Sequence, residues 1–259
     1  MPRMLARLLD IVILPAMVVS LALAFLYAPD EATMHSVYRI FYFHVPAAAA
    51  SFLGFALVCA SSVLYLRTRR LRYDVIAAAA AEVGVLFCTL GIGMGMLWAK
   101  PVWGTFWIPG DIHLMTTAVL LLIYVAYLML RAAVDDPERR ARLAAVVGIF
   151  GFAGVPIVYF SIRIVQVGNH PVLKGLDPRM QLTFMVCMTT MMLFFTFVLL
   201  RRIRLGDARS AVERLQRDAW AMAERWEDGA EAPRIVAGAE HVASTLVTTE
   251  STIGAAKAR

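Results

Sequence analysis

Histidine is the residue whose type and placement in this chain point most directly to chemistry. Four of the five histidines, His35, His44, His113 and His170, lie beside the ends of long apolar runs, whereas His241 lies in a polar tail. Neutral imidazole is the usual protein ligand of haem iron, and two imidazoles can occupy both axial positions. A single histidine at such a place is more simply explained by a structural hydrogen bond. Four on one face favour a shared site.

Large aromatic residues form a second candidate group, in the segment 98–111. This segment contains Trp98, Trp103, Phe106 and Trp107, with Lys100 among them. Stacked indoles hold a flat porphyrin well, and a nearby cation can neutralise its propionates. The same composition is typical of an aromatic belt at the depth of lipid headgroups. The residues alone leave both interpretations open.

Other motifs carry weaker signals. The glycines at 91, 93 and 95 have the spacing of a nucleotide-binding loop, but no strand precedes them and their surroundings are apolar, which favours close helix packing. Glu82 lies about 12 Å along a helix from Asp74 at about 1.5 Å per residue, so we expect it within the membrane as either a functional or a structural carboxylate. No metal-site or redox spacing joins the cysteines, Cys59, Cys88 and Cys187.

The composition indicates that lipid surrounds the elements that position these residues. Hydrophobic residues make up 60% of the 259-residue chain, charged residues only 17%, and mean hydropathy is +0.69. Six apolar stretches are long enough to cross a hydrocarbon core of roughly 30 Å. We therefore predict an all-α, polytopic membrane protein whose first stretch is a retained anchor, because no small-residue cleavage site follows it. The predicted spans are 9–27, 45–66, 75–98, 112–130, 143–162 and 182–200.

Basic residues predict the orientation, because short cytoplasmic loops retain arginine and lysine. One alternating set of loops holds thirteen: Arg3, Arg7, Arg67, Arg69, Arg70, Arg72, Arg131, Arg139, Arg140, Arg142, Arg201, Arg202 and Arg204. The opposite set holds four: Arg39, Lys100, Lys174 and Arg179. Both termini are expected in the cytoplasm, and His35, His44, His113 and His170 on the other side. Topology thus accounts for the net charge of +6, and nucleic-acid binding loses its support.

The composition becomes polar after Arg204. We predict a six-helix domain over residues 1–204 and a cytoplasmic tail over 205–259. Within the tail, apolar residues recur at helical spacing, which predicts an amphipathic helix over about 207–228, lying on the membrane surface. Residues 230–259 have no such period and are expected to be loose.

Three segments resemble the haem-handling C subunit of the bacterial cytochrome c maturation system, within the wider cytochrome c assembly family. Residues 38–47, YRIFYFHVPA, are similar to the family segment that ends in His-Val-Pro before the second helix. Residues 100–107, KPVWGTFW, are similar to the opening of its tryptophan-rich motif. The loop from Asn169 to Met180 occupies the place of the family's second haem-liganding histidine. The resemblance covers roughly residues 9–200.

The resemblance implies a site for non-covalent haem b at the outer face of the bacterial inner membrane. His44 and His170 would be the axial ligands, with Trp103 and Trp107 beside the ring. The other implied site residues are Trp98, Lys100, Phe106, Asp111, His113, Arg163 and Arg179; the arginines are equally explained as snorkelling to lipid headgroups. The implied partners are a periplasmic haem chaperone, an ATP-binding cassette transporter and small membrane subunits. No catalytic residue is implied.

One segment departs from the family pattern. After Trp107 the family has a hydrophobic residue, another tryptophan and an aspartate, whereas Ile108, Pro109 and Gly110 precede Asp111 here. The third tryptophan is missing, and His113 stands near the place of an expected arginine. The Pro-Gly pair predicts a locally different turn.

Two other functions remain as alternatives. A haem lyase that attaches haem to apocytochrome shares the tryptophan-rich motif, but such proteins have more helices or a large periplasmic domain. A haem-binding subunit of an electron-transfer complex would have histidines facing one another within its helices. This sequence has room neither for further helices nor for such a domain, and the rim positions of His44 and His170 argue against the electron-transfer subunit.

Overall fold

The structure is a computed structural model that describes residues 3–164 and 177–227, with side chains described at 9–161 and 177–225. All the secondary-structure elements of the described residues are helices. Six helical segments are long and apolar enough to cross a membrane. The predicted fold class and number of spans are therefore confirmed. Clustering of contacts divides the chain into a compact unit up to Asp207 and a second unit from Ala208.

Each of the first four spans is formed by one continuous helical segment. Helix α1 (Arg3–Ala22) is extended by the π-helical turn Leu23–Tyr27, and the short 3₁₀ helix Ser36–Ile40 leads directly into α2 (Phe41–Thr68). Helix α3 covers Leu71–Trp103 and α4 covers Ile112–Ala133. These helices extend beyond the predicted spans by several residues, because hydropathy marks only the part of a helix that faces lipid.

The fifth span is formed by two helices, α5 (Pro137–Phe152) and α6 (Gly154–Ile164). Pro156 explains the break, because it lacks the N–H that would bond the carbonyl of Phe152 and its ring crowds that carbonyl. Helix α7 (Pro178–Glu227) contains the sixth span and continues through the segment predicted as amphipathic. In that second unit Val212, Leu215 and Met222 are exposed. Its position on a membrane surface stays a prediction.

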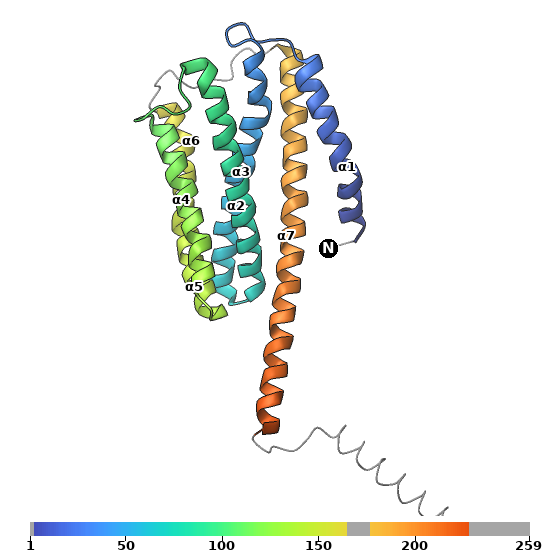
Figure 1. Ribbon diagram of the computed structural model, residues 1–259, viewed down its shortest axis with the longest axis vertical. Coiled ribbons are helices and arrows are strands. Elements are labelled where there is room, and N and C mark those ends of the chain that lie inside the picture. The colour runs from blue at the N-terminus through green and yellow to red at the C-terminus, as the bar shows by residue number, and fades with distance from the viewer. Residues whose placement is uncertain (1–2, 165–176, 228–259) are drawn as a thin grey trace, which may run out of the picture. The chain divides into compact units, whose positions relative to one another are not determined.

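Helices α2 and α3 pack closely along a seam of small residues (Figure 1). A Cβ atom added at Gly54 would lie 2.9 Å from Gly84 Cα, so only glycine permits this separation. Further along the seam Ala47, Ala50 and Ala80 are completely buried. Small residues let helix backbones approach closely, which is the main source of helix association in lipid.

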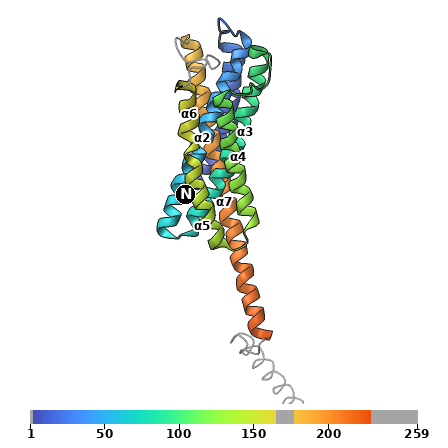
Figure 2. The same cartoon turned by 90° about the vertical axis from the view of Figure 1, so that its left-hand side faces the viewer.

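The basic loops gather at one end of the six-span unit. Figures 1 and 2 both place the α2–α3 turn and the α4–α5 connection at that end, with the α3–α4 connection and residues 28–35 at the opposite end. Arg67, Arg69 and Arg70 belong to the first of these turns, and Arg139 and Arg140 follow the second. The division of charge predicted from the loops therefore coincides with the two ends of one bundle. The membrane side of each end stays a prediction.

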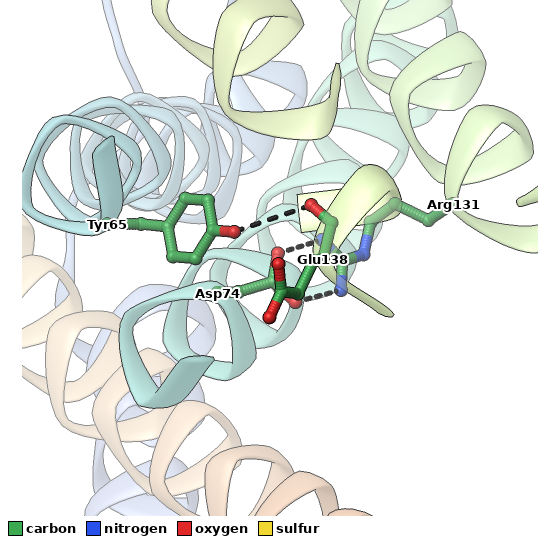
Figure 3. Close-up of polar contacts among 4 residues, drawn as sticks. All are labelled: Tyr65, Asp74, Arg131 and Glu138. Carbon is green, nitrogen blue, oxygen red and sulfur yellow. Dashed lines mark hydrogen bonds and ion pairs between the residues drawn. The ribbon is translucent and has the colours of Figure 1, made fainter. Parts of the chain in front are cut away.

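Acidic residues near the basic end pair with arginines from other helices. Asp74 of α3 accepts hydrogen bonds from both terminal nitrogens of Arg131 in α4, and the Nη2 to Oδ2 distance is 2.8 Å (Figure 3). Beside this pair the Tyr65 hydroxyl donates to the Glu138 carbonyl at 3.4 Å, which joins α2 to α5. Glu82 pairs with Arg202 of α7, which makes it an ion-paired carboxylate between two helices.

We expect Asp74→Asn to lower the free energy of unfolding by about 3–5 kcal/mol, the usual effect of removing one partner from a buried ion pair. Asp74 and Arg131 are only 8% and 13% exposed. Asp10→Asn is the matched control, because Asp10 and Arg201 form a pair that is 37% and 51% exposed, and such pairs contribute about 0.2–1 kcal/mol. Denaturant unfolding of the two variants in detergent micelles measures the difference. Equal losses would contradict the prediction.

Candidate functional site

His44 lies in the first turns of α2, with its ring against α3. Its Nδ1 atom is 2.9 Å from the carbonyl oxygen of Gly91, and its ring centroid is 5.9 Å from that of Trp98 in an edge-on arrangement. The side chain is half-buried. His44 is therefore a residue of the α2–α3 seam, at the end of the bundle away from the basic loops.

Trp98 belongs to an aromatic cluster that closes this end of the bundle. Its ring meets Tyr38 edge-on at 5.9 Å and Phe41 at 6.3 Å, and Phe41 stacks on Phe184 of α7 at 5.0 Å. Tyr38, Phe41 and Tyr42 are buried. The cluster ties α2, α3 and α7 together around the helix turn that carries His44. Trp98 is thus a half-buried residue packed in the bundle, and its indole Nε1 has no hydrogen-bond acceptor among the described residues.

The segment expected to connect the third and fourth helices is partly helical. Helix α3 continues to Trp103, so Trp98, Lys100 and Trp103 are helical and only residues 104–111 form the connection. The prediction that the third helix ends at Trp98 was wrong, because Lys100 and Pro101 end the apolar run without ending the helix. Gly104 ends it instead, with φ of +76° and its N–H donating to the Lys100 carbonyl at 3.0 Å.

Within the connection, the predicted site residues contact one another locally. Lys100 Nζ donates to the Gly104 carbonyl at 2.9 Å and lies 5.3 Å from the ring centroid of Phe106, which is 48% exposed. Trp103 and Trp107 are half-buried. The last turn of α3 and the connection together thus offer two indoles, an exposed aromatic ring and an exposed ammonium group at the end of the bundle that carries His44.

Residues 108–111, which depart from the family pattern, form a turn with a clear local structure. Asp111 N–H donates to the Ile108 carbonyl at 3.2 Å, and Gly110 has φ of +85°, as in a type II turn with proline at its second position. Asp111 then caps α4, because its carboxylate accepts from the Leu114 N–H at 3.0 Å. The predicted local turn is therefore confirmed, and Asp111 has a structural role here.

His113 contacts a different helix from His44. Its Nδ1 atom lies 3.1 Å from the Ser161 hydroxyl and 3.3 Å from the Val158 carbonyl, both in α6. The Ser161 hydroxyl donates to Val158 at 2.7 Å, so it accepts from the imidazole N–H. His113 thus joins α4 to α6 through a polar contact.

The remaining predicted site residues lie at or beyond the edge of the described structure. Arg179 is exposed, and its backbone N–H donates to the Asp177 carboxylate at 2.8 Å. The side chain of Arg163, and the whole of His170 and Lys174, lie outside the described residues. His35 is exposed, with a backbone φ of +51°. Among the described residues, no three His, Cys, Asp or Glu side chains form a metal-binding group.

The residues that sequence reasoning missed are the supports of His44. Phe184, from α7, and the Gly91 carbonyl are distant in sequence from the histidine they help to place. One local signal was available: Gly91, Gly95 and Ala99 recur every four residues and so form a small-residue face on α3.

Comparison with known proteins identifies the family. Residues 1–222 match the family described as Heme exporter protein C. The Heme exporter protein C of Bradyrhizobium diazoefficiens is 33% identical over 173 residues, which are 66% of this chain and 65% of that protein. Its Escherichia coli K12 counterpart is 30% identical over 158 residues, 60% of this chain and 64% of that protein. The chain belongs to this family, and its six apolar helices make it a multi-pass membrane protein.

The match does not extend over the whole of these relatives. It covers less than two thirds of the length of either one. The Heme exporter protein C of Rhodobacter capsulatus is 29% identical over 127 residues, which are 49% of this chain and 52% of that protein. The resemblance predicted from the sequence is confirmed at the level of the family, because residues 1–222 match that family.

We expect His113 to stabilise the bundle through Ser161. His113→Ala should lower the free energy of unfolding by about 1–3 kcal/mol, because it leaves buried polar groups of α6 without their partner. In the double variant, Ser161→Ala should add little to the loss of stability caused by His113→Ala, since the two substitutions remove the same contact. His35→Ala, at an exposed histidine, should change stability by less than about 0.5 kcal/mol. A His113→Ala variant as stable as His35→Ala would disprove this role.

Proposed function

We propose that this chain binds haem at the outer face of the bacterial inner membrane and delivers it to a periplasmic haem chaperone during c-type cytochrome biogenesis. The observation that carries the proposal is His44: an imidazole packed beside Trp98, at the end of the bundle opposite the arginine-rich loops. The names of the relatives point the same way, because they describe heme exporters. Haem is here the cargo, and the polypeptide positions it without transforming it.

The residues at the end of the bundle that carries His44 fit haem in their chemistry. Haem iron takes a neutral imidazole nitrogen, and the porphyrin needs apolar or aromatic surfaces together with cations for its propionates. Trp103 at the end of α3 supplies aromatic surface, as do Phe106 and Trp107 in the segment that follows, and Lys100 near the end of α3 supplies an exposed cation. Coordination and packing hold haem b without a covalent bond, which leaves it free to pass to an acceptor.

His170 is the proposed second axial ligand, and Arg163 and Arg179 are proposed to pair with the propionates. Two neutral imidazoles on opposite faces of the ring give a six-coordinate, low-spin iron. His113 is the other candidate for the second ligand, and its contact with Ser161 already gives it a structural role between α4 and α6. The family further supports an ATP-binding cassette transporter and small membrane subunits as partners.

The expected result of removing His44 and His170 together is loss of haem from the purified protein and loss of its low-spin spectrum. Single His→Ala variants at all five histidines, followed by haem quantification and absorption spectra, separate the candidates. His241→Ala is the control and should bind haem normally. Full haem content with an unchanged low-spin spectrum in the His44→Ala, His170→Ala double variant would overturn the ligand assignment.

The orientation predicted from the arginines places the connection 104–111 outside the cytoplasm. Alkaline phosphatase is active only after export, so a fusion at Gly110 should be active, whereas fusions at Arg69 and Asp135 should be inactive. Green fluorescent protein at the same three positions should give the reverse pattern. Phosphatase activity at Arg69 combined with none at Gly110 would put the haem site on the wrong side and remove the proposed delivery to a periplasmic acceptor.

A further inference from the structure

We propose that the Gly91–Gly95 face of α3 is the positioning element of the haem site: it fixes the tautomer of His44 and holds its ring so that Nε2 is the ligating atom. This inference deepens the proposed function and rests on it. It assigns a role to two residues without side chains, which act on haem only through His44.

The tautomer follows from the partner of Nδ1. A carbonyl oxygen can only accept a hydrogen bond, so the 2.9 Å contact with Gly91 requires that Nδ1 carries the proton. In a neutral imidazole the lone pair is then on Nε2, the atom that can coordinate iron. A hydrogen bond from the other ring nitrogen also raises the basicity of the ligating nitrogen. Because the acceptor belongs to the backbone of α3, it survives any side-chain substitution at position 91.

The position of the ring depends on the absence of a side chain at Gly95. A Cβ atom added there would lie 3.0 Å from His44 Cε1 and 3.5 Å from Nδ1. That is closer than an ordinary van der Waals contact, so even alanine would push the ring away from α3. The edge of Trp98, one helical turn beyond Gly95, contacts the same imidazole at 5.9 Å between ring centroids. The ring is thus held between a glycine surface and an indole.

Gly93 provides a matched control on the same helix. A Cβ atom at Gly93 would meet nothing within 4 Å, whereas one at Gly95 would lie 3.0 Å from His44 Cε1. The Gly93→Ala and Gly95→Ala changes are chemically identical and two residues apart, and they differ in whether the new methyl group reaches His44.

The experiment compares Gly93→Ala and Gly95→Ala in the whole chain, purified in detergent and titrated with haem. We expect Gly95→Ala to weaken haem binding about 10-fold or more, the usual effect of disturbing the support of a metal-ligating histidine, and to diminish the low-spin spectrum. Gly93→Ala should match the unchanged protein. If Gly95→Ala binds haem with the affinity and spectrum of Gly93→Ala, the positioning role is overturned.

A second measurement separates this inference from the proposed function and needs no haem. In haem-free protein with ¹⁵N-labelled histidine, the signal missing from the His44→Gln variant identifies His44, and its shifts report which nitrogen is protonated. We expect Nδ1 of His44 to carry the proton. A proton on Nε2 and none on Nδ1 would overturn the inferred tautomer, and this result does not depend on whether Gly95→Ala folds. If His44→Ala leaves haem binding unchanged, the ligand assignment fails. If His44→Ala loses haem but Gly95→Ala binds haem as the unchanged protein does, only the role of the glycine face is refuted.

Discussion

The close approach of α2 and α3 is the constraint on which the rest of the structure depends. In lipid there is no hydrophobic force between helices, so close backbone contact must supply the association. Gly54 and Gly84 permit this contact, since a Cβ atom at Gly54 would come within 2.9 Å of the facing Cα. The same approach, continued along the two helices, brings His44 to the carbonyl of Gly91. The packing of the two helices and the position of His44 are thus consequences of one seam.

Charge within the helices is organised by the same need for partners. An unpaired carboxylate in an apolar medium is costly, and Asp74 and Glu82 each meet an arginine from another helix. These pairs connect α3 to α4 and to α7, and all the groups involved lie toward the basic end. The opposite end is closed instead by aromatic rings. The bundle therefore has one end suited to anchoring by charge and another whose chemistry suits a flat aromatic cargo.

The number of membrane spans was predictable from the sequence, because each apolar run is a local property. Helix ends were not, as α3 shows: its apolar run stops near Trp98, but backbone hydrogen bonding continues to Gly104, where a positive φ ends the helix. The partners of Asp74 and Glu82 lie 57 and 120 residues away, and no local pattern indicates such a pairing. For the proposed site, the sequence predicted His44 and Trp98, but it could not reveal that His44 contacts a backbone carbonyl of α3.

Residue type and topology alone cannot distinguish a haem ligand from a packing residue, as the comparison of His44 with His113 shows. Both are half-buried at the same end, and both use Nδ1 to bond a neighbouring helix. The neighbours of His113 include a hydroxyl, Ser161, so its contact is one polar link between two helices. His44 contacts the Gly91 carbonyl and the Trp98 indole, and its ring lies against Gly95, all of them in α3. These contacts, set by the α2–α3 seam, are the reason that His44 is proposed for coordination.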